Sequence, residues 1–321
     1  MTDAKASVAS IGVVVVTHRA RTLIADCLAP LLASPLRPRI LVVNSSSGDG
    51  TVEAAAALGV ETISVPRRQF NHGLTRELAR RRLATPIVVM LTPDVHACRD
   101  DFLELLTAPI LRGEAAVAYA RQLAGEGHGV LERVGREFSY PGTSHVRSLA
   151  DWSRYGSYTR FCSNAAAAWS SEALDRIGGF KATLVSEETI AAAELLERGE
   201  RVAYVAEAEV RHAHRLGPVG AFRRQFDVGY TRRLHAALLL AGEGDLSRGR
   251  RFATTAIVRT LREAPAEMPR TLAVLAASWA GYRAGLAGPP LPTALARHLS
   301  SQDYYWSSEA RPRPAGVWAP G

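Results

Sequence analysis

The sequence predicts an α/β fold in which one sheet carries helices on both faces. Runs of apolar, β-branched residues alternate with helical segments between residues 11 and 92, which is the pattern of successive strand–helix–strand units. The first run, IGVVVVT at residues 11–17, is almost continuously apolar, as expected for a strand that is covered on both faces. Polar clusters follow three of the expected strands, at the edge where ligands bind in such sheets.

The expected elements of this first part alternate regularly between strand and helix. The strands contain β-branched residues, and turn signals such as SSSGDG separate them from the helices. In chain order they are a strand at 11–17, a helix at about 21–33, a strand at 39–44, a helix from 51, a strand at 61–65, a helix at about 72–83 and a strand at 86–92. Strands that are joined through helices run parallel to one another.

The remaining chain is expected to complete the sheet and then to become helical. Residues 125–158 are polar and irregular, which predicts a long loop or lid. The next expected elements are helices at about 170–176 and 187–198 and two short strands at 201–206 and 208–213. From Val219 onward the chain is mainly helical and rich in arginine.

Composition narrows the class of protein and of partner. The chain has 321 residues, 47% hydrophobic and 22% charged, which is typical of a globular protein. No segment resembles a signal peptide or a membrane-spanning helix and the three cysteines are widely spaced, so a cytoplasmic location is expected. The net charge of +8 favours an anionic partner, either a phosphorylated substrate or an acidic membrane face. Nucleic acid is not an expected partner, because no nucleic-acid-binding motif is present.

The polar clusters at the strand ends are the first candidates for a functional site. The carboxyl ends of neighbouring parallel strands lie at one edge of a sheet, so these clusters are expected to converge. They comprise Thr17 and His18, the turn from Asn44 to Asp49, and the segment from Thr92 to Asp94.

Each acid in these clusters has two interpretations. Asp49 either shapes the turn and caps the next helix or lies in a nucleotide pocket, where Asn44 would meet the base or the ribose. The turn is not GxGxxG, which counts against an NAD enzyme. Asp94 either caps a short helix or binds Mg²⁺ or Mn²⁺ together with the oxygens of a diphosphate.

Further candidates lie elsewhere along the chain. Glu187 and Glu188 open a helix, where they either favour the helix dipole or supply a general base for an attacking hydroxyl. His212 and His214 alternate on an expected strand, so both imidazoles face the same side as ordinary histidines or as metal ligands. Asn71, in the segment FNHG, is expected to cap a helix.

Taken in order, these segments resemble the family 2 glycosyltransferases of the GT-A fold, and more closely their bacterial rhamnosyltransferase branch. The resemblance extends from about Ile11 to Trp306 and rests on the order of many motifs. The matching segments are VVVVTH, VVNSSSGDGT, QFNHGLTR, VVMLTPD, YARQL, FCSNAAAAW, IGGF, SEET, YVAEAEVRHAH, FRRQFDVGYTRR, GYRAGLAG and LSSQDYYW. The resemblance implies a GT-A catalytic domain at 8–216, with a nucleotide-sugar half at about 8–122 and an acceptor half at about 123–216. A basic helical region at 217–306 and a flexible tail at 307–321 would follow.

The resemblance also implies roles for individual residues. Glu188, next to Glu187, takes the position of the catalytic base. Asp94 takes the position of the last acid in the family's metal-binding motif, and His214 offers a further metal ligand. The positions expected to bind the nucleotide sugar are Thr17, His18, Asn44, Asp49, Asn71, His72, Arg76, Thr92, Asp94, Arg121 and Asn164.

Three positions depart from the family pattern. Asn44 stands where the family usually has Asp, and Pro93 stands before Asp94 where Gln or Ser is usual. Glu188 stands where Asp is usual, so its carboxylate reaches one methylene further. A displacement of ~1 Å in a reacting group costs about 10²-fold in rate. These departures imply either a relaxed donor preference or an impaired enzyme.

The reaction implied by the resemblance is a metal-dependent, inverting transfer of a sugar, with Mg²⁺ or Mn²⁺ as cofactor. The implied donor is dTDP-β-L-rhamnose, and the implied acceptor is a hydroxyl of a glycan or of a polyprenyl-linked glycan in cell-surface polysaccharide synthesis. The basic C-terminal helices suit a peripheral position on an anionic membrane surface, at the inner face of the plasma membrane. They suit equally well a solvated helical appendix or the contact surface of a homodimer.

Two other classes of protein are compatible with parts of the sequence. A protein of the same fold that binds a nucleotide sugar or a partner without transfer is suggested by Asn44 and Glu188. A nucleotidyltransferase ranks last, because THRART after the first strand has no glycine, whereas that class usually carries a glycine-rich phosphate loop there.

Overall fold

The computed structural model describes residues 10–125, 127–212, 214–240, 245–287 and 292–309. Within these residues the strands form a single mixed sheet in the order β3-β2-β1-β4-β8-β6-β9-β5, with β7 paired to β9. Their bounds are β1 Ile11–Thr17, β2 Arg39–Asn44, β3 Glu61–Ser64, β4 Ile87–Leu91, β5 His96–Ala97, β6 Val117–Leu123, β7 His145–Arg147, β8 Ala166–Ser170 and β9 Val202–Arg211.

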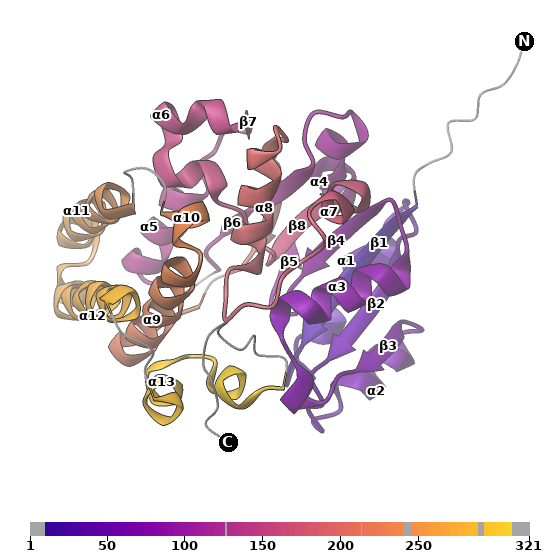
Figure 1. The fold of residues 1–321 in the computed structure, drawn as a ribbon, viewed down its shortest axis with the longest axis horizontal. Coiled ribbons are helices and arrows are strands. Elements are labelled where there is room, and N and C mark those ends of the chain that lie inside the picture. Colours follow the sequence, from indigo (N-terminus) through magenta and orange to yellow (C-terminus); the bar gives the residue numbers. More distant parts are fainter. Residues whose placement is uncertain (1–9, 126, 213, 241–244, 288–291, 310–321) are drawn as a thin grey trace, which may run out of the picture.

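Helices flank this sheet and then form a separate helical layer (Figure 1). Those of the sheet region are α1 Ile24–Ala33, α2 Thr51–Ala57, α3 His72–Leu83, α4 Phe102–Leu111, α5 Val130–Ser139, α6 Trp152–Tyr155, α7 Ser171–Arg176 and α8 Glu187–Glu197. Those of the C-terminal region are α9 Pro218–Leu234, α10 Ala236–Leu239, α11 Asp245–Glu263, α12 Met268–Ala287 and α13 Thr293–Leu299, followed by a 3₁₀ helix, η5, at Asp303–Ser307.

The parallel half of the sheet forms as the sequence predicts. Strands β3, β2, β1 and β4 are parallel neighbours, and α1, α2 and α3 provide the connections between them in chain order. The sheet becomes mixed at β8, which runs antiparallel to both β4 and β6. The predicted mixed α/β architecture with a helical C-terminal region is therefore confirmed.

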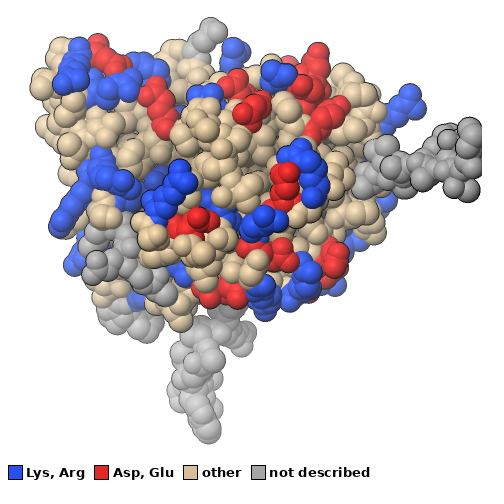
Figure 2. All heavy atoms as spheres, turned by 90° about the horizontal axis from the view of Figure 1, so that it is seen from above, with Lys and Arg blue, Asp and Glu red and all other residues tan. Residues whose placement is uncertain are grey.

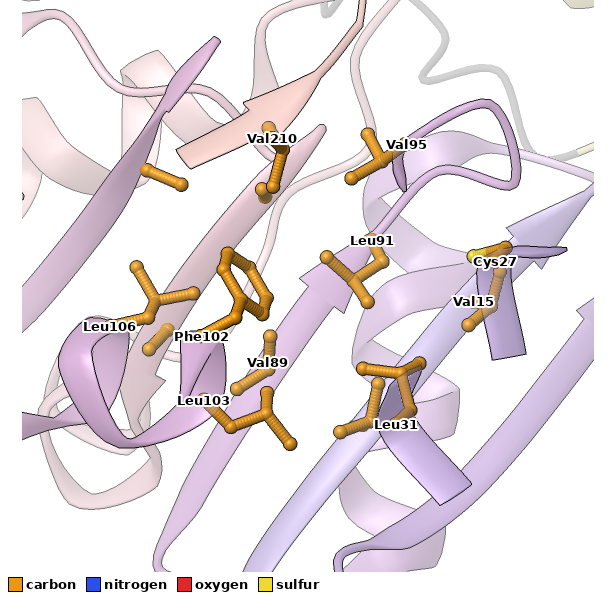
Figure 3. Packing of buried hydrophobic residues seen from close by; sticks show 14 of the residues in the cluster. Val15, Cys27, Leu31, Val89, Leu91, Val95, Phe102, Leu103, Leu106 and Val210 are labelled. Carbon is orange, nitrogen blue, oxygen red and sulfur yellow. The ribbon is translucent and has the colours of Figure 1, made fainter. Parts of the chain in front are cut away.

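The continuously apolar β1 has a core on each face. Val13 and Val15 belong to a cluster with Leu31 of α1 and Phe102 of α4, and Figure 3 shows Val15, Leu31 and Phe102 with Val89 and Leu91 between them. Val14, on the opposite face of the strand, belongs to a second cluster that includes residues of α3 and α8. Alternate residues of a strand point to opposite faces, and each fully buried aliphatic side chain contributes about 1.5–3 kcal/mol. A strand buried on both faces is thereby held firmly in register.

The expected loop or lid at 125–158 is wrong for much of its length, because it contains α5. Val130, Leu131 and Val134 pack with apolar residues of α9, α11 and α12. The polar residues between them form ion pairs with the same region: Arg133 with Glu263 at 2.9 Å, and Glu132 with Arg270. The helix is stabilised by partners more than a hundred residues away in the chain. The polar residues of the segment therefore gave no indication of a helix.

The two short strands expected at 201–206 and 208–213 are one strand, β9, of ten residues. Its register with β6 shifts between Ala120 and Arg121, which pair with Val205 and Glu209. A bulge of this kind accommodates the extra residues without ending the strand.

The C-terminal helices pack by close backbone contact. A Cβ atom on Gly281 of α12 would lie 2.1 Å from the carbonyl oxygen of Phe222 in α9, and one on Gly285 would lie 2.3 Å from that of Phe226. Only glycine permits this approach. None of the helices in the described ranges combines the length and the apolarity required to cross a lipid bilayer.

The chain then returns from α13 to the sheet domain. Ser301 N donates to Asp227 of α9 at 2.9 Å, and Glu309 N donates to the carbonyl oxygen of Arg68 at 2.9 Å. Of the tail predicted to be flexible at 307–321, residues 310–321 lie outside the described residues.

Candidate functional site

The expected convergence of the strand ends is present in the structure. Thr17 and Asn44 are paired at the ends of β1 and β2, and Thr92 follows β4, the other neighbour of β1. Thr17 and Asn44 are both buried. The Thr17 hydroxyl donates to the carbonyl oxygen of Val43 at 3.3 Å, and Thr92 N donates to that of Ala165 at 3.2 Å.

Asn44 and Asp49 organise the turn between β2 and α2. Asn44 Oδ1 accepts from Ser47 N at 2.8 Å, and Asp49 accepts from Arg21 N at 3.1 Å and from the Thr51 hydroxyl at 2.8 Å. Although desolvation opposes it, hydrogen bonds from Thr51 and Ser47 lower the pKa of Asp49 to about 2. Asp49 therefore shapes the turn, which is one of its two predicted roles. Its hydrogen bonds hold the turn in place beside the ends of β1 and β2.

Arg67 lies beside this turn, although it was not a candidate from the sequence. Its Nη1 donates to Ser45 Oγ at 3.2 Å, and Ser45 Oγ is 2.9 Å from His18 Nδ1. Burial and the charges of Arg67 and Arg19 lower the pKa of His18. The Arg67 guanidinium lies 3.8 Å from the ring centroid of Tyr304 in η5, so the C-terminal segment reaches this side of the site.

Asp94, His212 and His214 meet in one cluster, and their ligand atoms all lie within 4.8 Å of one another. Asp94 Oδ2 is 3.3 Å from His212 Nε2 and 2.7 Å from His214 Nε2. The second oxygen, Asp94 Oδ1, and the Thr92 hydroxyl are buried without a hydrogen-bond partner among the described residues. The two histidines were expected on a strand, but they lie just beyond the end of β9. Both nevertheless contact Asp94.

Gln122 and Arg136 orient His212, and neither was a candidate from the sequence. Gln122 Oε1 accepts from Arg136 Nη1 at 2.7 Å and lies 2.9 Å from His212 Nδ1. Gln122 Nε2 donates to Ser163 Oγ at 2.9 Å. The arginine identifies Oε1 as the acceptor, so His212 Nδ1 carries the proton, and Nε2 is the ring nitrogen available to a metal ion when the imidazole is neutral.

This arrangement fits a divalent metal ion. Burial lowers the pKa of His212, which favours the neutral imidazole. Burial opposes ionisation of Asp94, but its contacts with His212 and His214 hold the pKa of Asp94 well below its usual range. A carboxylate oxygen without a partner and an oriented imidazole lone pair are metal-ligand groups, and a hydrogen bond to the far ring nitrogen is the usual support for such an imidazole.

Glu187 is held in a buried ion pair. Its Oε1 accepts from Arg76 and from Asn164 Nδ2 at 3.3 Å, and Asn164 Oδ1 accepts from Trp169 Nε1 at 2.8 Å. Although burial favours the neutral acid, the charge of Arg76 holds the pKa of Glu187 below its usual range. Asn164 follows Ser163, the partner of Gln122, so the acid pair and the metal-type cluster belong to one connected site.

Glu188 is the carboxylate without such a partner. No side chain among the described residues forms a hydrogen bond or an ion pair with it, and burial together with the charge of Glu187 raises its pKa to about 8. The preceding Ser186 has a φ of 65°, an uncommon conformation for a residue with a side chain. This backbone turn begins α8 and places both acids at its first turn.

The segment FNHG supports Glu187 from α3. Asn71 caps α3 through Gly73 N and Leu74 N, as predicted. Burial and the charge of Arg76 lower the pKa of His72 to about 4, so this imidazole is neutral.

Arg121 was also expected to bind the nucleotide sugar, but it forms a 2.8 Å ion pair with Glu209 across β6 and β9. The next residue, Gln122, contacts His212.

Residues 12–180 match the family described as Glycosyl transferase family 2, and the chain belongs to this family. Its architecture is that of the GT-A glycosyltransferases, as the resemblance in sequence implies.

Two relatives from Salmonella are similar along almost their whole length. The chain is 30% identical over 302 residues to the O-antigen chain rhamnosyltransferase RfbN of Salmonella typhimurium, covering 93% of this chain and 96% of that protein. It is 30% identical over 272 residues to the O-antigen chain rhamnosyltransferase WbaN of Salmonella anatum, covering 84% and 86%. The protein is thus a rhamnosyltransferase-like member of the family.

Solved structures share the fold at lower identity. TarS 1-349 of S. aureus in complex with UDP-GlcNAc superposes with a TM-score of 0.58 at 14% identity, covering 94% of this chain and 90% of that one. The mannosyltransferase PcManGT of Pyrobaculum calidifontis, in complex with GDP-Man and Mn²⁺, superposes with a TM-score of 0.55 at 20% identity, covering 93% and 83%.

Proposed function

We propose that this protein transfers L-rhamnose from dTDP-β-L-rhamnose to a hydroxyl of a glycan or lipid-linked acceptor, with inversion at the anomeric carbon. The observation that carries the proposal is one connected site, in which the Asp94–His212–His214 cluster is linked through Gln122 and Ser163 to the segment that binds Glu187. The names of the two Salmonella relatives support rhamnose as the sugar.

Asp94, His212 and His214 would hold the metal ion. When bound there, the ion would neutralise charge on the departing nucleoside diphosphate. Mg²⁺ takes oxygen ligands almost throughout, so two imidazoles favour Mn²⁺ of the two expected ions. The complex of PcManGT with GDP-Man and Mn²⁺ supports the same choice.

The nucleotide would bind at the ends of β1 and β2. Thr17, His18 and Asn44 lie there with Arg67 beside them. Asp49 would act by holding the turn in which Asn44 lies. His72, Arg76 and Asn164 would act by fixing Glu187, because their contacts lead to that carboxylate.

Glu188 would be the general base. Its carboxylate would take the proton of the acceptor hydroxyl while the hydroxyl oxygen forms a bond to the anomeric carbon. The bond from the anomeric carbon to the diphosphate oxygen breaks, and its electron pair leaves with dTDP. A base with a pKa near the working pH is suited to this proton transfer, and the free carboxylate of Glu188 meets that requirement better than the paired Glu187.

The three parts of the chain would divide this work. The nucleotide-sugar half at about 8–122 would bind the donor, the acceptor half at about 123–216 would supply Glu188, and the helical region at 217–306 would face the acceptor or a membrane. Exposed apolar side chains on this region, including Val219, Leu261 and Trp279, support a peripheral position at a membrane. Figure 2 shows basic and acidic side chains intermixed over the face seen from above, so this face is not a uniformly basic surface.

The direct test is a transfer assay with a panel of dTDP-, UDP- and GDP-sugars and a lipid-linked glycan acceptor, with release of the nucleoside diphosphate as the readout. The proposal expects release from dTDP-L-rhamnose in the presence of Mn²⁺ and an α-linked product by nuclear magnetic resonance. Release from another donor alone would overturn the assignment of rhamnose. Binding of a nucleotide sugar without any transfer would favour a binding protein of the same fold.

A further inference from the structure

A cavity of about 330 Å³ opens beside the candidate metal cluster. Its walls come from α5, α9, α11 and α12 and from the segment before α9. His214, a member of the metal-type cluster, and Arg136, which holds Gln122, both line it. The cavity therefore begins where the proposed reaction takes place. We call it the α5–α12 groove.

The groove combines apolar walls with polar and charged side chains. The apolar side chains are contributed by every flanking element, among them Leu131 of α5, Ala221 of α9, Phe252 of α11, and Val274 and Leu275 of α12. Its volume lies at the lower end of the range of about 300–1,000 Å³ that is usual for ligand sites. Apolar side chains beside a polar reaction centre suit a ligand with an apolar and a polar part.

Two guanidinium groups lie in the same groove. Arg224 of α9 is exposed and forms no ion pair with any of the described residues, and its charge acts on both Glu188 and His72. Arg136 lies within reach of the charge of Asp94. The acid of the groove, Glu132, is already paired with Arg270. An unpaired arginine between apolar walls and the candidate base suits a phosphate or another anionic group.

We infer that the α5–α12 groove is the acceptor site, and that it takes an amphipathic acceptor whose anionic group meets Arg224 and whose apolar chain lies against α5, α11 and α12. This inference rests on the proposed function. It adds the location of the lipid-linked acceptor already proposed, whose isoprenoid or acyl chain and phosphate or diphosphate would lie in this groove.

The groove offers a position at which it can be filled without disturbing the backbone. A Cβ atom on Gly135 of α5 would lie 3.9 Å from Phe252, which is ordinary contact, whereas one on Gly249 of α11 would meet nothing within 4 Å. Gly135→Leu therefore directs a side chain into the groove, and Gly249→Leu is the matched control outside it. Leucine is also the better helix former at both positions. Ser278→Phe fills the groove from the opposite wall on α12.

The experiment is calorimetric titration of the full chain with farnesyl diphosphate below its micellar range, with EDTA present so that the metal cluster does not contribute. We expect the wild type and Gly249→Leu to bind it, and both filling variants to lose at least about tenfold in affinity. We expect Arg224→Gln to weaken binding by about tenfold, the loss of one charge-assisted contact. Inorganic diphosphate should bind more weakly than farnesyl diphosphate in every case.

Binding that is unchanged in both filling variants, or absent from the wild type, would overturn the inference. A parallel titration of each variant with dTDP-L-rhamnose and Mn²⁺ separates it from the proposed function. If farnesyl diphosphate binding depends on the groove but the donor does not bind, the acceptor site is supported and the donor assignment is overturned. If the donor binds but farnesyl diphosphate binding is unchanged in the filling variants, the donor assignment is supported and the acceptor site is overturned.

Discussion

Glu187 and Glu188 are adjacent in the chain but differ in their surroundings. Arg76 and Asn164 hold Glu187 ionised, whereas burial and the neighbouring charge raise the pKa of Glu188 to about 8. Two carboxylates whose pKa values are driven apart are a frequent arrangement in active sites. The pair supports assigning the proton transfer to Glu188 and a positioning role to Glu187.

Glu188→Gln should abolish most of the transfer while leaving donor binding unchanged, because it removes the base and keeps the side-chain volume. We expect a loss of about 10²–10⁴-fold in kcat. In the wild type, kcat/KM should rise with pH and level off above about pH 8, because the base acts only when deprotonated. A pH profile that falls over this range, or full activity in Glu188→Gln, would contradict the assignment.

The same substitution should also affect stability. A carboxyl group whose folded-state pKa is raised binds a proton in the folded protein that the unfolded chain has lost, so its contribution to stability falls as the pH rises from about 4.5 to about 8. Glu188→Gln removes this loss. We expect its Tm relative to the wild type to increase between about pH 5 and about pH 8. An equal Tm difference at both pH values would show that Glu188 titrates normally.

Gln122 should matter for metal binding through His212. Gln122→Leu removes the acceptor that fixes the proton on His212 Nδ1, and we expect Mn²⁺ affinity to fall about 10–100-fold. Gln122→Glu retains an acceptor oxygen and should recover part of that affinity. Mn²⁺ binding measured by electron paramagnetic resonance checks both. Equal affinity in wild type and Gln122→Leu would show that His212 does not depend on this contact.

Among the helices and strands, the sequence predicts correctly those whose local residue pattern matches their burial in the fold. The strands from β1 to β4 and the helices between them follow from apolar runs and turn residues, since β1, β2 and β4 are buried along almost their whole length. The helix α5 and the single strand β9 did not follow. Their stability depends on distant partners, such as Arg270 and Glu263 for α5 and the shifted pairing with β6 for β9.

The site shows the same limit. Asp94, Glu188 and His214 stand in motifs and could be proposed from sequence. Gln122 and Arg67 could not be proposed from sequence, because their contacts are with residues elsewhere in the chain. Gln122 contacts His212, and Arg67 contacts Ser45 and Tyr304. Their signal lies in three-dimensional contact, and although Gln122 lies in the motif YARQL, that motif pointed to its neighbour Arg121.

The contact of α9 with α12 gives a prediction at this scale. Gly281→Ala would place a methyl group 2.1 Å from the carbonyl oxygen of Phe222, so the helices must separate. We expect a loss of about 1–3 kcal/mol in the free energy of unfolding, typical of overpacking. Gly249→Ala, at a helix position with open space, should instead gain up to about 1 kcal/mol. Urea denaturation of both variants checks this, and equal stability would contradict the tight helix contact.

At the scale of the whole molecule, the net charge of +8 and the exposed apolar residues of the C-terminal helices lead to a prediction about membranes. The chain should co-sediment with vesicles rich in phosphatidylglycerol and less with vesicles of phosphatidylcholine, and added salt should weaken the binding. Trp279→Ala should reduce it further, because Trp279 is 64% exposed. Equal binding to both kinds of vesicle would show that the net charge does not contribute, and binding to neither would place the C-terminal helices away from a membrane.

The strand-end site is expected to bind a nucleotide sugar through a metal ion on Asp94. Calorimetry of the purified protein with dTDP-L-rhamnose, with and without Mn²⁺, alongside Asp94→Ala, tests this binding most directly. We expect binding that requires Mn²⁺ and is lost in Asp94→Ala, while the variant keeps the wild-type circular dichroism spectrum. Metal-independent binding that persists in Asp94→Ala, or no binding by the folded wild-type protein, would contradict it.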